Sequence, residues 1–271
     1  AMTVFRSPAL SLLGRYAFRT RLPQAASILT LVGGLAGAMG PLANSLILSL
    51  GPWLAFAIGS GVLLLATLAL RWVGPNYGVD LPDRSSHAPQ PLSWLGLTLV
   101  FGAGVGVTLG FRLISVTFPE VLKQQVPGAP VAPILGLMFI TLALTAIPAG
   151  AIATRLGNHR VMVLGLALMA LLAAGMTTLH SLILGVMLAT LMGAAFSLVA
   201  NGTIPFALAQ VPPEKAGLGT GLYFSGGALA LSLWGTLSGG RSLPPGLSAG
   251  LAVLAFGVAG LCVWRAGRVP P

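Results

Sequence analysis

Polar side chains recur at helical spacing around Arg112, within an otherwise apolar stretch. Thr108, Arg112 and Ser115 follow one another at i, i+4 and i+7, so a helix places them on one face. An arginine at the centre of a membrane helix costs at least about 2.5 to 3.5 kcal/mol, so it normally faces a cavity or a partner. This stripe predicts a surface for a substrate or for gating. The alternative is that Arg112, 19 residues or roughly 28 Å of helix after Ser93, reaches the outer headgroups.

Three prolines lie inside apolar runs: Pro41, Pro148 and Pro205. Each removes a backbone donor and frees the carbonyl four residues earlier, so each predicts a helix kink. Near Pro205, the side chains of Asn201 and Thr203 either line a substrate path or hydrogen-bond to a neighbouring helix. Tyr223 is a further candidate for the path, with packing or a place at the membrane interface as the alternative.

Groups for acid–base or metal chemistry are scarce. The acidic residues fall in predicted loops or at helix ends: Asp80, Asp83, Glu120 and Glu214. Proton coupling through a membrane helix needs an Asp, Glu or His at depth, and the pattern shows none. The histidines, His87, His159 and His180, are far apart and lack Cys or carboxylate companions at ligand spacing. We therefore expect no catalytic residue, no metal site and no cofactor.

Eight apolar stretches, each long enough to cross a bilayer, contain most of the chain. They lie near residues 25–49, 52–72, 92–118, 132–153, 161–178, 181–208, 217–238 and 247–264. A membrane helix needs roughly 20 mostly apolar residues. With 56% hydrophobic and 7% charged residues, a water-soluble domain would expose large apolar patches. The sequence predicts an all-α polytopic membrane protein. Gly102, Gly106 and Gly110, on a different face from Arg112, suit close helix packing.

Basic residues alternate between the loops in a way that predicts orientation. With a cytoplasmic N-terminus, eleven basic residues lie inside, against only Lys123 and Arg241 outside. The inside set is Arg6, Arg15, Arg19, Arg21, Arg71, Arg84, Arg155, Arg160, Lys215, Arg265 and Arg268. We expect both termini in the cytoplasm and the protein in a membrane, the bacterial inner membrane being the natural candidate. Because the net charge of +10 is scattered through short loops, no nucleic-acid partner is expected.

A polar, proline-rich stretch divides the predicted helices into two before it and six after it. The predicted organisation is a basic cytoplasmic segment at 1–24, two helices at 25–72, a cytoplasmic linker at 73–91 and a six-helix bundle at 92–271. Residues 150–160 carry Gly150, Arg155, Gly157 and Arg160. This run resembles the loop signature of the major facilitator superfamily, with Thr154 in place of the usual Asp. Residues 33–41 are similar to the glycine-proline motif found in the fifth helix of many of its antiporters.

Residues 201–209 and 217–222 carry a second resemblance. The run Ile-Pro-Phe-Ala-Leu followed by Gly-x-Gly-x-Gly-Leu is similar to the tenth-to-eleventh helix region of the sucrose/proton symporter branch of the same superfamily. Residues 6–13 resemble that branch's loop between the fourth and fifth helices. The superfamily resemblance implies a partial fold: the six-helix C-terminal bundle plus the last two helices of the N-terminal bundle, with the first four helices missing.

The resemblance implies a secondary transporter in which two bundles rock about a central site. The expected partners are a small-molecule solute, such as a sugar or another small organic molecule, the lipid bilayer and the missing N-terminal helices. In the loop motif, Gly150 and Gly157 would permit close approach, and Arg155 and Arg160 would form a cytoplasmic gate; the alternative is that both are ordinary membrane anchors. A second functional hypothesis is a membrane scaffold or assembly factor, for example for pigment-protein assembly, that does not transport.

Overall fold

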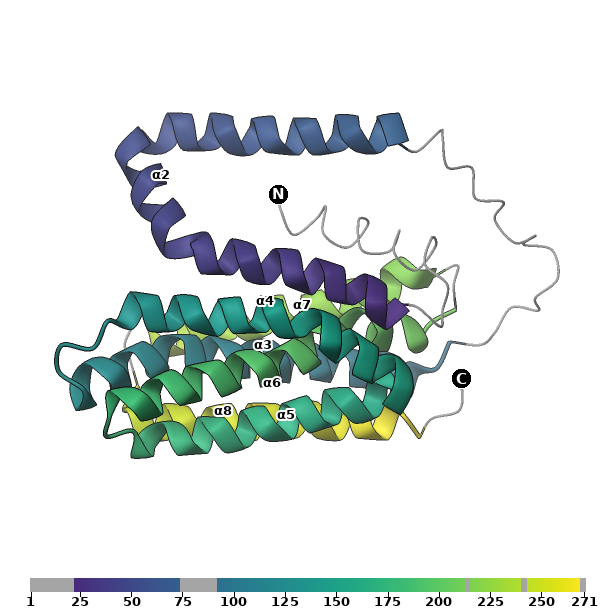
Figure 1. Ribbon diagram of the computed structural model, residues 1–271. Coiled ribbons are helices and arrows are strands. Elements are labelled where there is room, and N and C mark those ends of the chain that lie inside the picture. Colours follow the sequence, from purple (N-terminus) through teal and green to yellow (C-terminus); the bar gives the residue numbers. More distant parts are fainter. Residues whose placement is uncertain (1–21, 74–91, 213–214, 240–242, 269–271) are drawn as a thin grey trace. The chain divides into compact units, whose positions relative to one another are not determined.

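The computed structural model describes residues 22–73, 92–212, 215–239 and 243–268, with the backbone alone at 41–50, 52, 55, 70 and 73 (Figure 1). These residues form helices and short connections, so the predicted all-α class is confirmed. The helices are α2 (Leu22–Val73), α3 (Trp94–Gln125), α4 (Val131–Leu156), α5 (Asn158–Gly175), the 3-10 helix η4 (Met176–Thr178), α6 (Leu182–Ala209), α7 (Ala216–Ser238) and α8 (Pro245–Ala266). The predicted segment 1–24 and linker 73–91 fall almost wholly outside the described residues.

Among the described residues, seven helices are long and apolar enough to cross a membrane. Six of them correspond one to one with the predicted spans that follow residue 91. The seventh of these helices, Leu22–Gly40, overlaps the first predicted span, 25–49. The second predicted span, 52–72, contains a shorter apolar helix, Phe56–Ala69. Both are parts of α2, which breaks at Gly51, where φ is 80° and ψ is 163°. A residue with a side chain rarely adopts this conformation, so glycine allows the chain to turn there.

Helix ends follow local chemistry. The Ser93 hydroxyl accepts a hydrogen bond from the Gly96 N–H at 3.2 Å, and Ser181 caps α6 by accepting from the Leu184 N–H at 3.3 Å. Between α4 and α5, Gly157 takes a φ of 91°.

The predicted end of the third span at residue 118 is wrong, because α3 continues through Pro119 to Gln125. The surrounding bundle buries Phe118 and Leu122 completely, and this packing outweighs the loss of one hydrogen bond at the proline.

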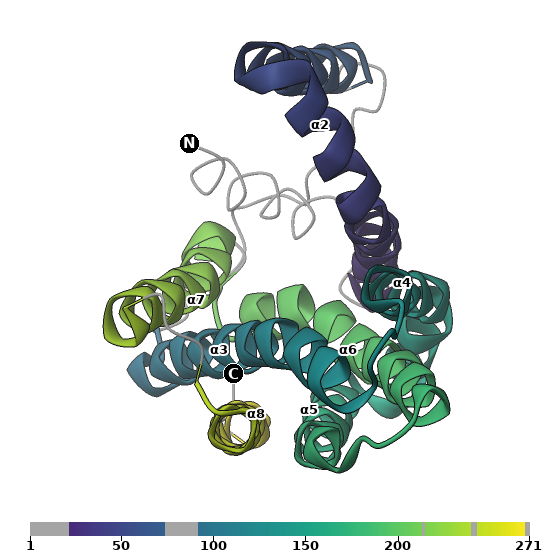
Figure 2. The same cartoon turned by 90° about the vertical axis from the view of Figure 1, so that its left-hand side faces the viewer.

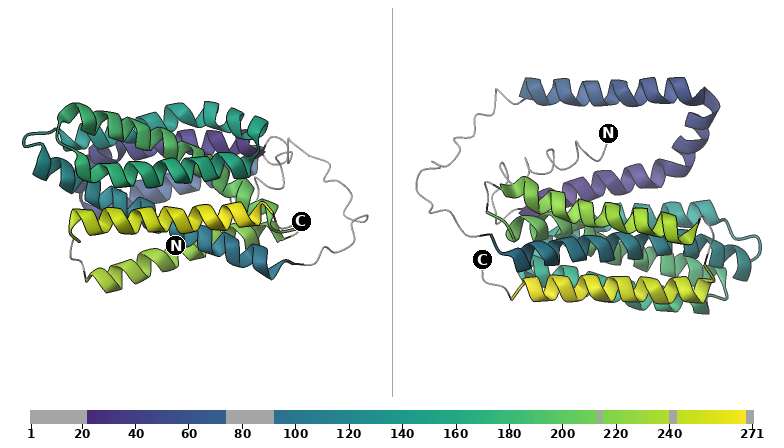
Figure 3. Two further views of the ribbon diagram at one scale, coloured as in Figure 1. Left: turned by 90° about the horizontal axis from the view of Figure 1, so that it is seen from below. Right: turned by 180° about the vertical axis from the view of Figure 1, so that it is seen from behind.

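Helices α3 to α8, together with residues 22–38 of α2, form one compact unit. Figure 2 shows α3 and α6 between α7 and α4, with α8 and α5 on one side of this pair. Seen from behind, α3 lies between α7 and α8 (Figure 3, right). Phe118, Phe206 and Phe256 are among the largest side chains buried in the core. The inward-facing side chains of the helices therefore pack on one another. The outward faces carry exposed Leu and Val side chains that suit contact with lipid.

Glycines allow the backbones of neighbouring helices to approach. A methyl group added to Gly106 of α3 would come within 2.5 Å of the Ala255 carbonyl of α8, and one added to Gly110 would meet the Phe256 ring at 2.8 Å. The predicted glycine face of α3 is therefore its contact with α8. On α7, a methyl group at Gly226 would lie 2.3 Å from the Phe101 carbonyl of α3. Small residues at such contacts are typical of membrane bundles.

The first part of α2 packs on α4 through three such contacts. Added methyl groups would meet Ala143 Cβ at 2.9 Å from Gly34, the Phe139 ring at 2.8 Å from Gly37, and Ser27 Cβ at 2.7 Å from Gly150. Residues 22–38 thus share a packed surface with a helix of the predicted C-terminal bundle. The division of the chain into the four predicted regions stays a prediction.

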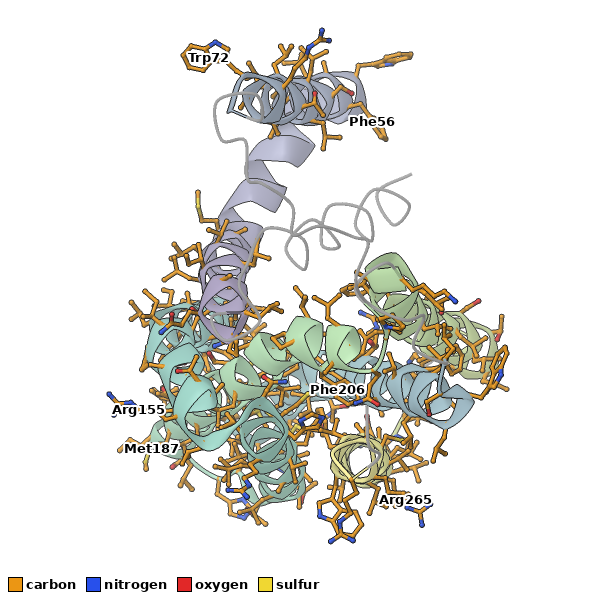
Figure 4. All side chains as sticks on the ribbon, turned by 90° about the vertical axis from the view of Figure 1, so that its right-hand side faces the viewer. Phe56, Trp72, Arg155, Met187, Phe206 and Arg265 are labelled. Atoms are coloured by element: carbon orange, nitrogen blue, oxygen red, sulfur yellow. The ribbon has the colours of Figure 1, made fainter. Side chains whose placement is uncertain are left out.

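Residues 39–73 belong to a second compact unit. Its described part is the later portion of α2, on both sides of the Gly51 break. Trp53, Phe56 and Trp72 are all more than three-quarters exposed, and Figure 4 shows Phe56 and Trp72 projecting from the helix. Large apolar side chains exposed along a helix suit contact with lipid or with other apolar helices.

Candidate functional site

The face of α3 that points away from α8 carries the predicted polar stripe. Gly106 and Gly110 contact α8, and a residue two positions later on a helix points to roughly the opposite side, so Thr108 and Arg112 face away from α8. Thr108 Oγ1 would lie 2.5 Å from a methyl group at Gly227, which places it against α7. Arg112 is exposed, and the described part of the chain gives it no hydrogen bond or ion pair. The site's cation is therefore uncompensated by protein groups that the structure describes.

Ser115 belongs to the stripe by spacing but satisfies its hydroxyl within its own helix. Its Oγ donates to the Phe111 carbonyl at 2.8 Å. This is a local hydrogen bond of the kind that serine and threonine commonly make in apolar helices. Ser115 therefore needs no external partner, whereas the described part of the chain provides none for Arg112.

A cluster of three phenylalanines lies beside this face. Phe111 of α3 stacks on Phe196 of α6 with ring centroids 4.2 Å apart and planes at 17°, and it meets the edge of Phe139 of α4 at 6.4 Å and 75°. All three rings are half-buried. Sequence reasoning missed this cluster, because the three residues come from helices whose neighbours the pattern does not specify. Stacked aromatic faces offer a platform for a planar or apolar group.

Thr203 and Tyr223 come together between α6 and α7. Thr203 Oγ1 donates to the Val199 carbonyl at 3.0 Å and lies 3.4 Å from the Tyr223 hydroxyl oxygen. Both side chains are buried. A methyl group at Gly104 would come within 2.1 Å of the Tyr223 carbonyl, so α3 closes over the backbone of α7 at this point. The pair links helices in this structure; its predicted role in a substrate path stays a prediction.

Asn201 bridges two helices. Its Nδ2 donates to the Ala146 carbonyl of α4 at 2.6 Å, and its side chain is fully buried. Its Oδ1 and the hydroxyl of Ser197, one turn earlier on α6, have no hydrogen-bond partner among the described residues. Asn201 thus makes the predicted kind of hydrogen bond to a neighbouring helix, and its role in a substrate path stays a prediction. Pro148 and Pro205 both lie within helices that continue through them.

The loop motif occupies the junction of α4 and α5. Arg155 lies in the last turn of α4 and Arg160 in the first turn of α5, and both are exposed, with Gly157 between them. The Thr154 hydroxyl donates to the Ala151 carbonyl at 2.7 Å, so it is satisfied locally. Gly150, in the same helix as Arg155 and five residues before it, is buried against Ser27 of α2. The gate predicted for these residues stays a prediction. The kink predicted at Pro41 also stays a prediction; the non-helical dihedrals within α2 occur at Gly51.

Asn158 and His159, next to the motif's glycine, connect α5 to the core. Asn158 Nδ2 donates to the Gly202 carbonyl of α6 at 3.0 Å. The His159 ring meets the edge of Phe206 with centroids 5.9 Å apart. Asn158 Oδ1 and His159 Nε2 have no partner in the described ranges. The sequence predicted a loop motif here, but its pattern did not predict that α6 contacts Asn158 and His159.

Charge collects at one end of the six-helix arrangement. The residues at this end, which we call the basic end, are Arg155, Arg160, Lys215, Arg265 and Arg268. Figure 4 shows Arg155 and Arg265 projecting outward from α4 and α8. Glu120, the acidic residue that the described ranges contain, lies near the end of α3, at the opposite end of the bundle. No group of three or more potential metal ligands occurs in these ranges.

Comparison with known proteins assigns the chain to a family. The family model described as Major Facilitator Superfamily matches residues 100–271, which cover most of α3 and all of α4 to α8. No curated protein matches the chain. The match agrees with the membrane-length helices and with the glycine-mediated packing described above. The chain therefore belongs to the Major Facilitator Superfamily and is a membrane transporter in the general sense of that family.

Proposed function

We propose that this transporter moves a small organic anion by alternating access, with the Arg112 face of α3 as its contact surface. The observation that carries the proposal is the exposed guanidinium of Arg112 on the side of α3 that points away from α8. If Arg112 lies within the membrane, a cation without a protein counter-charge there favours an anionic ligand. The family match supports transport, and it favours this function over a scaffold that does not transport.

The neighbouring aromatic rings refine the class of solute. Phe111 precedes Arg112 directly, and its ring continues into the stack with Phe196 and the edge contact with Phe139. A solute with a carboxylate at one end and a planar or apolar body at the other would match both features, because the guanidinium binds carboxylates bidentately and aromatic faces bind apolar surface. Sugars remain compatible when they carry a negative charge.

The test is uptake into vesicles that contain the full chain, with sucrose, glucuronate and benzoate as radiolabelled probes. We expect glucuronate or benzoate to accumulate faster than sucrose. Arg112→Gln should lower that uptake by about tenfold or more, since it removes one charge-assisted pair. Arg112→Lys should keep part of it. Lys123→Gln, the matched loss of a charge near the end of the same helix, should leave uptake unchanged. Equal uptake by the Arg112→Gln and unmodified proteins would contradict the proposal.

A further inference from the structure

The beginning of α5 and the end of α8 meet at the basic end. A methyl group at Gly267 would lie 3.2 Å from Cδ2 of His159, so the two helix ends are in contact. Val263 and Ala266 turn inward and are buried. Arg160 follows His159 directly, and Arg265 and Arg268 flank Gly267, so the three arginines come from these adjoining ends. All three are exposed, and Arg265 projects outward from α8 (Figure 4).

Trp264 and Arg268 form a stacked pair on the outer side of α8. The guanidinium carbon of Arg268 lies 3.6 Å from the centroid of the Trp264 ring. Stacking uses the face of the guanidinium and leaves its N–H donors at the edge, where they can bind a phosphate. Trp264 is 44% exposed. Tryptophan with arginine at the end of an apolar helix is typical of the boundary between acyl chains and headgroups.

The outward faces of both helices continue from these arginines as apolar surface. On α8, Leu254, Val258 and Leu261 are each more than half exposed. On α5, Leu164 and Leu171 are likewise more than half exposed. A ligand that extends from the arginines along the helices would therefore meet charge at one end and hydrocarbon along its length. A phospholipid has this arrangement, whereas a soluble anion uses only the charged part.

The local charge is not neutralised by nearby carboxylates in the described ranges. Those ranges hold Glu120, which lies near the end of α3 that is opposite to the basic end. None of Arg160, Arg265 and Arg268 forms an ion pair with a described residue. Clusters of basic residues at a membrane surface attract anionic lipids. A zwitterionic lipid would bring its own positive group to the arginines and so fits less well.

We propose that Arg160, Arg265 and Arg268 bind the phosphate of an anionic phospholipid, with its acyl chains along the exposed faces of α5 and α8. Trp264 holds the Arg268 guanidinium in place at the level of the headgroups. The site lies on the outer side of the bundle, whereas Thr108 and Arg112 face away from α8. It does not depend on which solute the protein moves.

The experiment measures lipid binding to the purified full chain by native mass spectrometry, with phosphatidylglycerol and phosphatidylcholine as probes. We expect tighter binding of phosphatidylglycerol. Arg265→Gln/Arg268→Gln should weaken it by about tenfold, since each arginine supplies a charge-assisted hydrogen bond. Arg160→Gln should weaken it as well. The matched control, Arg155→Gln/Lys215→Gln, removes two charges from the same end on other helices and should leave binding unchanged.

Three outcomes would overturn the proposal. If both double variants weaken binding equally, the lipid responds to overall surface charge. If both lipids bind equally, no headgroup is selected. If excess inorganic phosphate displaces phosphatidylglycerol, the site takes a soluble anion.

A second measurement guards against variants that fail to fold. Brominated phosphatidylglycerol should quench the tryptophan fluorescence of the unmodified protein more than brominated phosphatidylcholine does. Trp264→Phe should remove that difference, because the site places Trp264 beside the headgroup. A difference that persists in Trp264→Phe would place the selective lipid elsewhere and reject this site.

Discussion

Asn201 and Ser197 show how two polar residues on one helix face can differ in their contribution to stability. Asn201 donates to the Ala146 carbonyl of α4 at 2.6 Å, whereas the hydroxyl of Ser197 has no partner in the described part of the chain. Both side chains are completely buried. A hydrogen bond between membrane helices is worth about 0.6 kcal/mol on average and up to about 1.7 kcal/mol. The bond at Asn201 is therefore a modest contributor to stability, and the hydroxyl of Ser197 contributes none by this route.

These two residues give a matched prediction. Asn201→Ala should lower the free energy of unfolding by about 1 kcal/mol, because it removes the bond to α4. Ser197→Ala should leave that free energy unchanged or raise it, because it removes a buried hydroxyl without a partner. Reversible unfolding in mixed detergent, followed by circular dichroism, measures both. Equal destabilisation by the two variants would show that the bond to Ala146 is not the source.

Spacing predicted the residues of the α3 face better than it predicted their partners. The i, i+4, i+7 pattern placed Thr108 and Arg112 together, and the structure directs both away from α8. The hydrogen bond of Ser115 within its own helix depends on the side-chain rotamer. The stacking of Phe111 on Phe196 depends on which helices are neighbours. A sequence pattern carries neither, because it specifies a face and not what lies across from it.

At the scale of the helix, the ends were the more predictable feature. Glycines, prolines and charged residues interrupt the apolar runs, and α4 to α8 begin and end within a few residues of the predicted spans. The end of α3 is the exception. Through Pro119, tertiary packing on Phe118 and Leu122 keeps α3 helical where the local rule predicts an end. At Gly51, by contrast, α2 breaks between the two predicted spans because glycine accepts the required dihedrals.

Two of the glycines of α7, Gly226 and Gly235, test how closely the helices approach. Gly226→Ala would bring a methyl group within 2.3 Å of the Phe101 carbonyl, and overpacking typically costs about 1 to 3 kcal/mol. Gly235 has open space around it, so Gly235→Ala should be neutral or stabilising, by up to about 1 kcal/mol from helix propensity. Thermal unfolding midpoints of the two variants should thus move in different directions. A Gly226→Ala protein as stable as the unmodified chain would argue against the close α3–α7 contact.

At the scale of the molecule, the distribution of charge specifies a direction. Five described basic residues gather where α5 and α7 begin and where α4 and α8 end, whereas Lys123 lies near the other end. By the positive-inside rule, we expect the basic end to face the cytoplasm. The family, the all-helical class and the six later helices were all predictable, since length, hydropathy and loop charge encode them directly. The packing of residues 22–38 on α4 was not, because it requires knowledge of distant neighbours.

Cysteine labelling tests the orientation. In a Cys262→Ala background, Arg155→Cys should react with a membrane-impermeant maleimide only after cells are permeabilised. Lys123→Cys should react on intact cells, because it lies near the opposite end of the bundle. Both side chains are exposed, so reagent access is not limited by the protein itself. The reverse pattern of reactivity would contradict the predicted topology.

The contact of Gly34 and Gly37 with α4 bears on how the chain could be divided. A cut between residues 74 and 91 would leave two polypeptides, and the later one would present Ala143 and the ring of Phe139 without the cover that α2 provides. The earlier polypeptide would carry the complementary glycine surface. Co-production of the halves should therefore let each solubilise the other, which makes this connection a natural place for a split reporter.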